Sequence, residues 1–152
     1  MVAAKALAGW RAGLSIIVCI GEPQDQRSNG SALTSCASQL AGSLFSAPSK
    51  STAIAVAYEP LWAIGSGRAP SSAQIVEMHQ HIRSCLTARF GQFGSAIRIL
   101  FGGSVTSANA AVILDLPEVG GLLIGGASLK ADKFDAILSL TDRSLCTASR
   151  RP

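Results

Sequence analysis

Four short apolar runs, rich in β-branched residues, are spaced along the chain with a longer polar–apolar stretch between each pair. The runs occupy residues 15–20, 52–58, 97–101 and 122–124. Runs of this length with little polar alternation are typical of strands buried in a parallel sheet. Because such strands alternate here with stretches long enough to be helices, the sequence predicts an α/β fold.

The stretches around these runs carry apolar residues at the spacing of one helix face. We expect helices over residues 31–45, 72–90, 107–116 and 131–140. A further helix should precede the first strand and end at Gly13, since glycine commonly follows a helix. The predicted order is one helix followed by four strand–helix units.

The length and composition suit one folded domain. The chain has 152 residues, of which 48% are hydrophobic and 14% are charged, a balance too apolar for intrinsic disorder. One core of this size is ordinary for a single domain, so we expect residues 1–152 to form one. The stretch 141–152 has no clear periodicity, and we expect it to be a disordered tail.

Charge, the length of the apolar runs and the spacing of the cysteines each exclude one kind of partner. The formal net charge is +4, but the basic residues are scattered and only Arg150 and Arg151 are adjacent, which argues against a nucleic-acid partner. The apolar runs are far shorter than the roughly 18 residues that cross a bilayer, so no membrane partner is expected. The four cysteines form no CxxC pair and no metal-binding spacing with His79 or His81. We therefore expect reduced thiols, no metal, and a cytoplasmic protein.

Glycine and small hydroxyl residues follow each predicted strand, at Gly21, 65–67, 102–104 and 125–128. In parallel α/β sheets the carboxyl ends of the strands meet at the edge where ligands bind. Backbone N–H groups in such loops can hold a phosphate, although glycine in these places can also serve only a tight turn. From the residues alone, both interpretations stay open.

Glu59 closes the second predicted strand and is followed by Pro60. An acid followed by proline at a strand end can simply cap a turn, and the residues alone favour that role.

A longer stretch of sequence changes that interpretation. Residues 57–67, AYEPLWAIGSG, resemble the signature of the triosephosphate isomerase family. The resemblance continues through 101–105 (FGGSV), 123–129 (LIGGASL) and 19–22 (CIGE), and it covers residues 1 to about 140. It implies a (β/α)₈ TIM barrel whose fifth to eighth strands are the four predicted here. The chain would then be an incomplete C-terminal half barrel with parallel strands and outer helices.

The resemblance also implies a reaction. Members interconvert dihydroxyacetone phosphate and glyceraldehyde 3-phosphate, a step of glycolysis and gluconeogenesis, without metal or organic cofactor. By position, Glu59 would be the catalytic base. The substrate phosphate would be bound by Gly65, Ser104, Gly125 and Gly126.

Other residues are implied in supporting roles. Residues 60–70 match the lid that closes over the substrate. Cys19 and Glu22 match positions near the catalytic strand, where we expect them to support Glu59 and the packing of the loops.

The same resemblance shows what the chain lacks. The family's electrophilic histidine, substrate-binding lysine and neighbouring asparagine come from the first half of the barrel and have no counterpart here. We expect His79 and His81 to be ordinary residues of the helix over 72–90. The expected partners are triose phosphate and either the missing N-terminal half or a second copy. The chain alone is expected to be inactive.

Two other functions are alternatives to this one. The chain could be a non-catalytic, phosphate-binding remnant of the family. Another phosphate-binding barrel enzyme is disfavoured, because the lid motif with Glu59 and Trp62 is specific to this family.

Two positions depart from the family pattern around the lid. Phe101 stands where the family commonly has a tyrosine whose hydroxyl bonds a lid amide, and Pro70 stands at that amide. Proline has no N–H to donate, so both ends of this contact are absent. A second contact of the family, from the Ser104 hydroxyl to the Gly67 amide, remains available.

Overall fold

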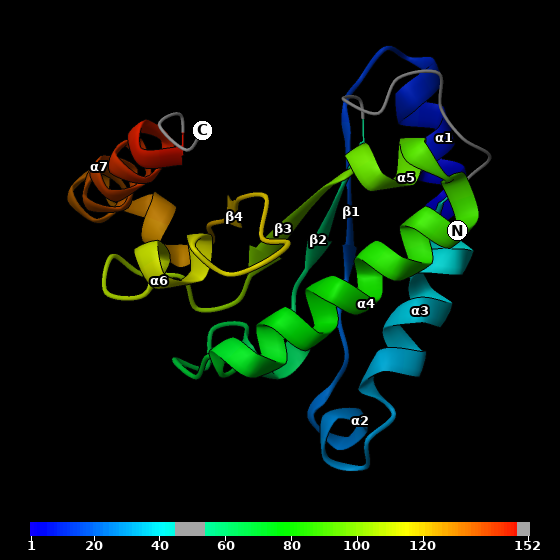
Figure 1. Cartoon of the computed structure of the whole chain (residues 1–152), viewed down its shortest axis with the longest axis horizontal. Helices are drawn as coiled ribbons and strands as arrows, with labels where there is room; N and C mark the ends of the chain where they lie inside the picture. The colour runs from blue at the N-terminus through cyan, green and yellow to red at the C-terminus, as the bar shows by residue number, and fades with distance from the viewer. Residues whose placement is uncertain (45–53, 149–152) are drawn as a thin grey trace.

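A computed structural model describes residues 1–44 and 54–148, with residues 141–148 described only in their backbone. Four parallel strands form one sheet in the order β1-β2-β3-β4 (Figure 1). They span Ile16–Ile20 (β1), Ile54–Tyr58 (β2), Arg98–Gly102 (β3) and Leu122–Leu123 (β4). The predicted α/β fold with parallel strands is confirmed, and the strand ends differ from the predicted ones by at most one residue wherever the chain is described. Residues 52 and 53 of the second predicted strand lie outside the described residues.

Helices connect the strands in the predicted order. The predicted ones span Val2–Arg11 (α1), Ala32–Ser43 (α3), Ser72–Phe90 (α4), Ala110–Leu114 (α6) and Ala131–Ala148 (α7). The sequence reasoning missed two helices of one turn, Gln24–Ser28 (α2) and Gln92–Ala96 (α5), because a single turn leaves no periodic pattern. Two 3₁₀ helices, Leu61–Ala63 (η2) and Gly126–Leu129 (η3), follow β2 and β4.

The ends of α4 follow the local sequence. The Ser71 hydroxyl accepts from the Gln74 amide, and the Gln74 side chain accepts from the Ser71 amide, forming a capping box. At the other end Gly91 adopts a φ of 58°, a left-handed conformation that glycine tolerates best. The helix therefore begins and ends where the sequence predicts.

Helix α7 continues beyond its predicted end. It runs to Ala148, so residues 141–148, expected in a disordered tail, are helical. Nothing in the sequence interrupts it, because residues 131–148 contain neither glycine nor proline. Residues 149–152 lie outside the described residues. Throughout 1–44 and 54–148, no helix combines the length and apolarity needed to cross a bilayer.

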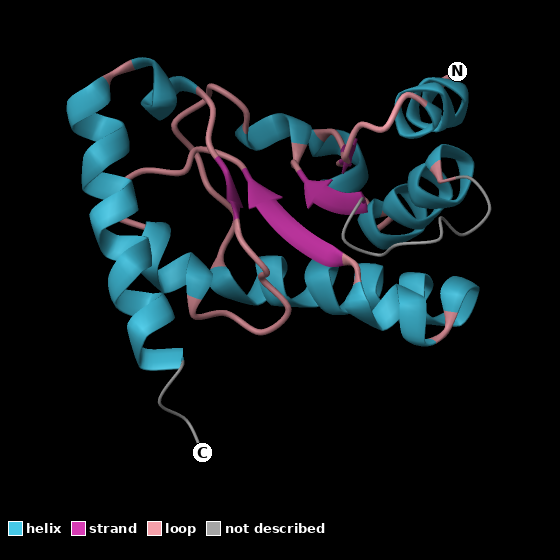
Figure 2. Ribbon diagram, turned by 90° about the horizontal axis from the view of Figure 1, so that it is seen from above, coloured by secondary structure: helices cyan, strands magenta, loops and turns pink. Residues whose placement is uncertain are grey.

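The strand register separates the side chains into two faces. Val18 pairs with Val56, which pairs with Ile99, and all three are buried. Tyr58 and Phe101 continue this face, on which α3, α4 and α6 place their apolar residues. In Figure 2 the long helix α4 runs alongside the strands. This face forms the hydrophobic core, as predicted for helices packed on a parallel sheet.

The other face of the sheet is only partly covered. On β1, Ile17 is 50% exposed and Cys19 is also exposed. Arg98 lies across the sheet from Ile17 and is exposed as well. The predicted burial of this strand therefore holds for the helix-covered face of β1 and not for the face with Ile17. Within the described chain β1 and β4 each pair on one side only, so no strand stands opposite this face.

Substituting one apolar residue on each face of β1 tests this arrangement. Ile17→Thr should change the free energy of unfolding by less than about 0.5 kcal/mol, because half of the Ile17 surface is already exposed to solvent. It should also reduce binding of a hydrophobic dye and weaken self-association, since it makes the open face less apolar. The measurements are urea unfolding, dye fluorescence and sedimentation at several concentrations.

The neighbouring residue is the matched control. Val18→Thr places a hydroxyl in the core, where Val18 is 2% exposed, and should cost about 1 to 3 kcal/mol. Equal losses of stability for the two variants would show that both faces of β1 are buried.

Candidate active site

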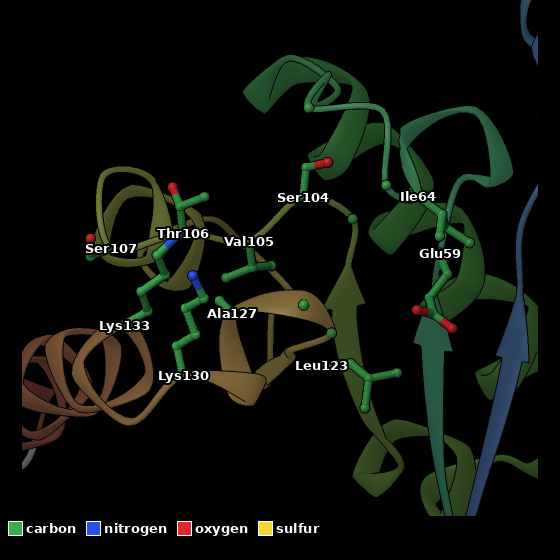
Figure 3. A pocket seen from close by; sticks show the side chains of 15 residues that line it. Glu59, Ile64, Ser104, Val105, Thr106, Ser107, Leu123, Ala127, Lys130 and Lys133 are labelled. Carbon is green, nitrogen blue, oxygen red and sulfur yellow. The ribbon is translucent and has the colours of Figure 1, made fainter.

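One pocket at the carboxyl ends of the strands brings the predicted site residues together. Its volume is about 550 Å³, and all five residues expected to act on the substrate line it: Glu59, Gly65, Ser104, Gly125 and Gly126. Figure 3 shows the Glu59 carboxylate at one side of this pocket, with Ser104 between it and the lysines opposite. Loops after β2, β3 and β4 therefore meet at one site, as parallel strands require.

Glu59 is held at the end of β2 by backbone contacts on both sides. Its amide donates to the Ile20 carbonyl at 2.8 Å, which extends the pairing of β1 and β2. A Cβ on Gly21 would overlap the Glu59 carbonyl oxygen, and a Cβ on Gly102 would lie 2.7 Å from the Glu59 Cγ. Glycine at these two positions lets the neighbouring strands approach the carboxylate closely.

Cys19 is the titratable neighbour of Glu59. Partial burial, a side-chain hydrogen bond to Glu59 and the negative charge of Glu59 together raise the pKa of the Cys19 thiol from 9.0 to about 11. The thiol is therefore protonated near neutral pH and can donate to the carboxylate. Cys19 therefore supports Glu59, as expected, through a hydrogen bond from its thiol to the carboxylate.

Glu22 forms a second polar cluster behind the pocket. The residue is 0% exposed, and its Oε1 accepts from Arg27 Nε at 2.8 Å and from the Tyr58 hydroxyl at 3.1 Å. The Cys36 thiol contacts the other carboxylate oxygen at 3.7 Å. These donors and the cationic Arg27 satisfy the hydrogen-bonding capacity of a carboxylate that has no contact with water.

The cluster is joined to the start of the lid. Trp62 Nε1 donates to the Glu22 carboxylate at 3.0 Å, and the Leu61 amide donates to the Glu22 carbonyl at 3.0 Å. Glu22 therefore holds the first turn of the loop, and no hydrogen bond joins its side chain to Glu59 among the described residues. It supports loop packing, as expected, and acts on Glu59 only through the backbone that follows.

The tip of the lid is exposed and carries two left-handed glycines. Gly65 and Gly67 have φ values of 65° and 71°, and residues 64–69 face solvent. The Arg68 guanidinium lies 5.5 Å from the centre of the Trp62 ring, so the two ends of the loop touch. The Ser104 hydroxyl donates to the Ala63 carbonyl at 2.6 Å. The contact expected from Ser104 to the Gly67 amide is not formed in this arrangement.

Ser104 itself has an unusual backbone. Its φ of 48° is left-handed, which is uncommon for a residue with a side chain and is found disproportionately at functional sites. Asn109 holds the turn in place, because its amide group donates to the Ser104 carbonyl at 3.1 Å and accepts from the Thr106 amide at 2.8 Å. The loop after β3 is thus fixed by its own side chains.

Two residues singled out in the sequence lie in the core and not in the pocket. Phe101 is fully buried, and its ring lies 6.2 Å from Tyr58 and 6.3 Å from His79, measured between ring centres. His79 is 0% exposed, its Nδ1 lies 3.1 Å from the Glu118 carbonyl, and burial lowers its pKa. A neutral histidine on α4 packed against aromatic rings is a core residue.

The structure adds four polar side chains to the site that the sequence did not predict. Thr106, Ser107, Lys130 and Lys133 line the pocket beside the glycine loops. Lys130 directly follows η3, and Lys133 lies in the first turn of α7. Their position after the LIGGASL motif was the available signal, but only the fold shows that they face the pocket.

Comparison with known proteins identifies the family. The sequence profile of the triosephosphate isomerase family matches residues 1–141. The chain belongs to the triosephosphate isomerase family. Two bacterial triosephosphate isomerases illustrate the likeness: that of Rhodopseudomonas palustris is 52% identical over 139 residues, and that of Hyphomonas neptunium is 51% identical over 140.

The likeness extends to solved structures. The crystal structure of triosephosphate isomerase from Bartonella henselae superposes with a TM-score of 0.84 at 41% sequence identity, covering 93% of this chain and 56% of that one. The chain likewise covers 54% and 56% of the two relatives, while 90% and 92% of its own length is matched. It therefore spans about half the length of the triosephosphate isomerases that it resembles.

The pairing of Cys19 with Glu59 can be tested by thiol chemistry. Glu59→Gln removes the negative charge that raises the pKa of Cys19, so more of the thiol ionises at pH 8.5. Alkylation of Cys19 by iodoacetamide should become about 3- to 10-fold faster. Peptide mapping by mass spectrometry separates Cys19 from the other cysteines. Glu77→Gln removes an exposed carboxylate outside the pocket and should leave the rate unchanged; equal acceleration by both variants would contradict the pairing.

A second test concerns stability at alkaline pH. Burial and the Glu22 charge raise the pKa of Cys36 from 9.0 to about 12 and raise the pKa of Tyr58. The folded chain thus holds these protons more tightly than the unfolded chain, so the free energy of unfolding should fall as pH rises above 9. Urea unfolding between pH 7 and 11 measures this. Cys36→Ala should make the decline shallower, and an identical decline would remove Cys36 as its cause.

Proposed function

We propose that the chain is the catalytic-base half of a triosephosphate isomerase, which interconverts dihydroxyacetone phosphate and glyceraldehyde 3-phosphate in the cytoplasm. One observation carries the proposal. The carboxylate at the end of β2 and the backbone loops after β3 and β4 line the same pocket of about 550 Å³. A small phosphorylated sugar needs a base at one end of its site and a phosphate cradle at the other.

Glu59 is the proposed base. The reaction removes a proton from the carbon beside the substrate carbonyl, forms an enediolate, and returns the proton to the adjacent carbon. A carboxylate can perform both transfers if it remains within reach of the two carbons. The Gly102 backbone runs close beside the Glu59 side chain, which supports this role because it limits where the carboxylate can lie.

The proposed phosphate site consists of Gly65, Ser104, Gly125 and Gly126. A dianion is stabilised by several N–H donors aimed at its oxygens. Beyond the adjacent backbone, no described atom lies within 4 Å of a Cβ built on Gly125 or Gly126, so the space beside them is open to a phosphate. Gly126 begins η3, whose first amides have no partners within the turn.

Among the described residues that line the pocket, none next to Glu59 can polarise the substrate carbonyl, because Lys130 and Lys133 stand on the far wall. Neither His79 nor His81 lines it. The developing charge on the enediolate therefore requires donors from another segment of chain. The open face around Ile17 also lacks the strands that would cover it. Both deficits point to a complementary half as the partner.

We further propose that this chain supplies the fifth to eighth strands, the C-terminal half of the barrel. The support is the order of the motifs along the chain, with the signature containing Glu59 followed by the two glycine loops. In the family these segments follow the fifth strand of the barrel. The share of the relatives that is covered, about half, fits a four-stranded sheet.

A non-catalytic, phosphate-binding remnant is the second candidate. The missing carbonyl-polarising group favours it for the chain by itself, because the phosphate loops and the lid are present without that group. The two proposals differ in whether turnover appears when the other half is supplied.

Complementation distinguishes them. The chain alone should isomerise triose phosphates at least about 10²-fold more slowly than a whole enzyme, since losing even one preorganised donor costs about that much. Co-expression with the first four strands of the Rhodopseudomonas palustris enzyme should restore turnover. Co-expression with the last four strands of the same enzyme should not, because those duplicate what the chain already supplies. Activity is measured on purified pairs free of the host's own isomerase.

The control keeps the assembly and removes the base. Glu59→Gln should pair with the first four strands as well as the unmodified chain does but lower kcat by about 10²- to 10⁴-fold. Phosphate binding without turnover in every pair would favour the remnant. Turnover with the last four strands alone would overturn the placement in the barrel.

A further inference from the structure

Two lysines form the wall of the pocket that faces Glu59. Lys130 lies between η3 and α7, and Lys133 lies one helical turn further along. Both residues line the pocket together with Thr106 and Ser107. Figure 3 shows their nitrogen atoms directed toward the Thr106 side of the pocket, away from the body of α7.

The charge of this wall is uncompensated. Among the described residues that line the pocket, Lys130 and Lys133 are the only cations and Glu59 is the only acid. Neither lysine takes part in an ion pair within residues 1–44 and 54–140. Asp132 lies between them in the sequence and pairs with neither. Two free ammonium groups at the rim of a pocket produce a positive potential at its entrance.

The positive charge of the two lysines can attract a phosphate dianion from a distance, which backbone amides cannot do. A phosphate monoester arrives as a dianion and must enter a pocket that already holds the Glu59 carboxylate. Backbone donors act only at hydrogen-bond distance, whereas charges act over about 10 Å at 0.1 M salt. Lysine suits the task, because its flexible stem lets the ammonium group follow a moving ligand.

We propose that Lys130 and Lys133 form a capture site for phosphate dianions, which attracts the phosphate group of a ligand and passes it to the glycine loops. The inference rests on the proposed function, since it assigns the loops of Ser104 and Gly126 as the place where the phosphate comes to rest. The inference adds Lys130 and Lys133 to the site and explains why two positively charged residues line it. Both are exposed, so they can reach an incoming ligand before it is enclosed.

Equilibrium dialysis of the full chain with radiolabelled inorganic phosphate tests the capture site. Replacing both lysines in one variant, Lys130→Gln with Lys133→Gln, should raise the Kd for phosphate by about 5-fold at 20 mM salt. At 0.5 M salt the two proteins should differ by less than about 2-fold, because ions screen exposed charges. Lys5→Gln is the matched control: it removes the same charge from α1, outside the pocket, and should change neither value.

A third variant separates this inference from the proposed function. Gly126→Val fills the pocket where a Cβ meets no other atom, so it should abolish phosphate binding without disturbing the fold. If Gly126→Val abolishes binding and the lysine variant matches Lys5→Gln, the loops bind phosphate and the capture site is wrong. If the lysine variant weakens binding and Gly126→Val does not, the lysines bind phosphate but the proposed resting place fails. No saturable binding by the unmodified chain would overturn both.

Discussion

The in-register pairing of parallel strands is the constraint on which the rest of this structure depends. Because β1, β2 and β3 run side by side in register, their carboxyl ends lie at one edge, and β4 extends that edge by two residues. Residues far apart in the sequence, Glu59 and Gly126 among them, meet there in one pocket. The same register places Val18, Val56 and Ile99 in one buried row, so a single pairing pattern determines both the core and the site.

Polar contacts position the loop after β2, which the pairing of the strands does not fix. Glu22 lies in the loop after β1 and, through Trp62, holds the beginning of the lid. Ser104 reaches the same loop from the end of β3 through the Ala63 carbonyl. The lid is thus attached at its first turn by two neighbouring strand ends, while its tip stays in solvent. This combination suits a loop that closes over a ligand, because only the tip must change its surroundings.

The four-stranded sheet is complete on one face and incomplete on the other. Its helix-covered face is a complete core, whereas the face with Ile17 and Arg98 has no covering strands in the described chain. Among the described residues, the pocket holds the proposed base Glu59, the glycine loops proposed to bind phosphate, and two lysines on the far wall. It holds no group next to Glu59 that could polarise a carbonyl. The structural deficit and the chemical deficit lie on the same side of the sheet, so one complementary segment would supply both.

The sequence by itself determined the alternation of strands and helices, the capping of α4 and the family, because apolar periodicity, cap residues and a specific motif are local in the chain. It also proposed Glu59 as the base, and the structure places that residue in the pocket. The sequence could not determine that Ile54 and Ile99 face the helices while Ile17 faces the open side, since strand alternation leaves the choice of face to the packing. Nor could it show that α7 continues through Ala148, or that Lys130 and Lys133 face the pocket. Those features depend on contacts between residues distant in sequence, and only the tertiary structure brings such residues together.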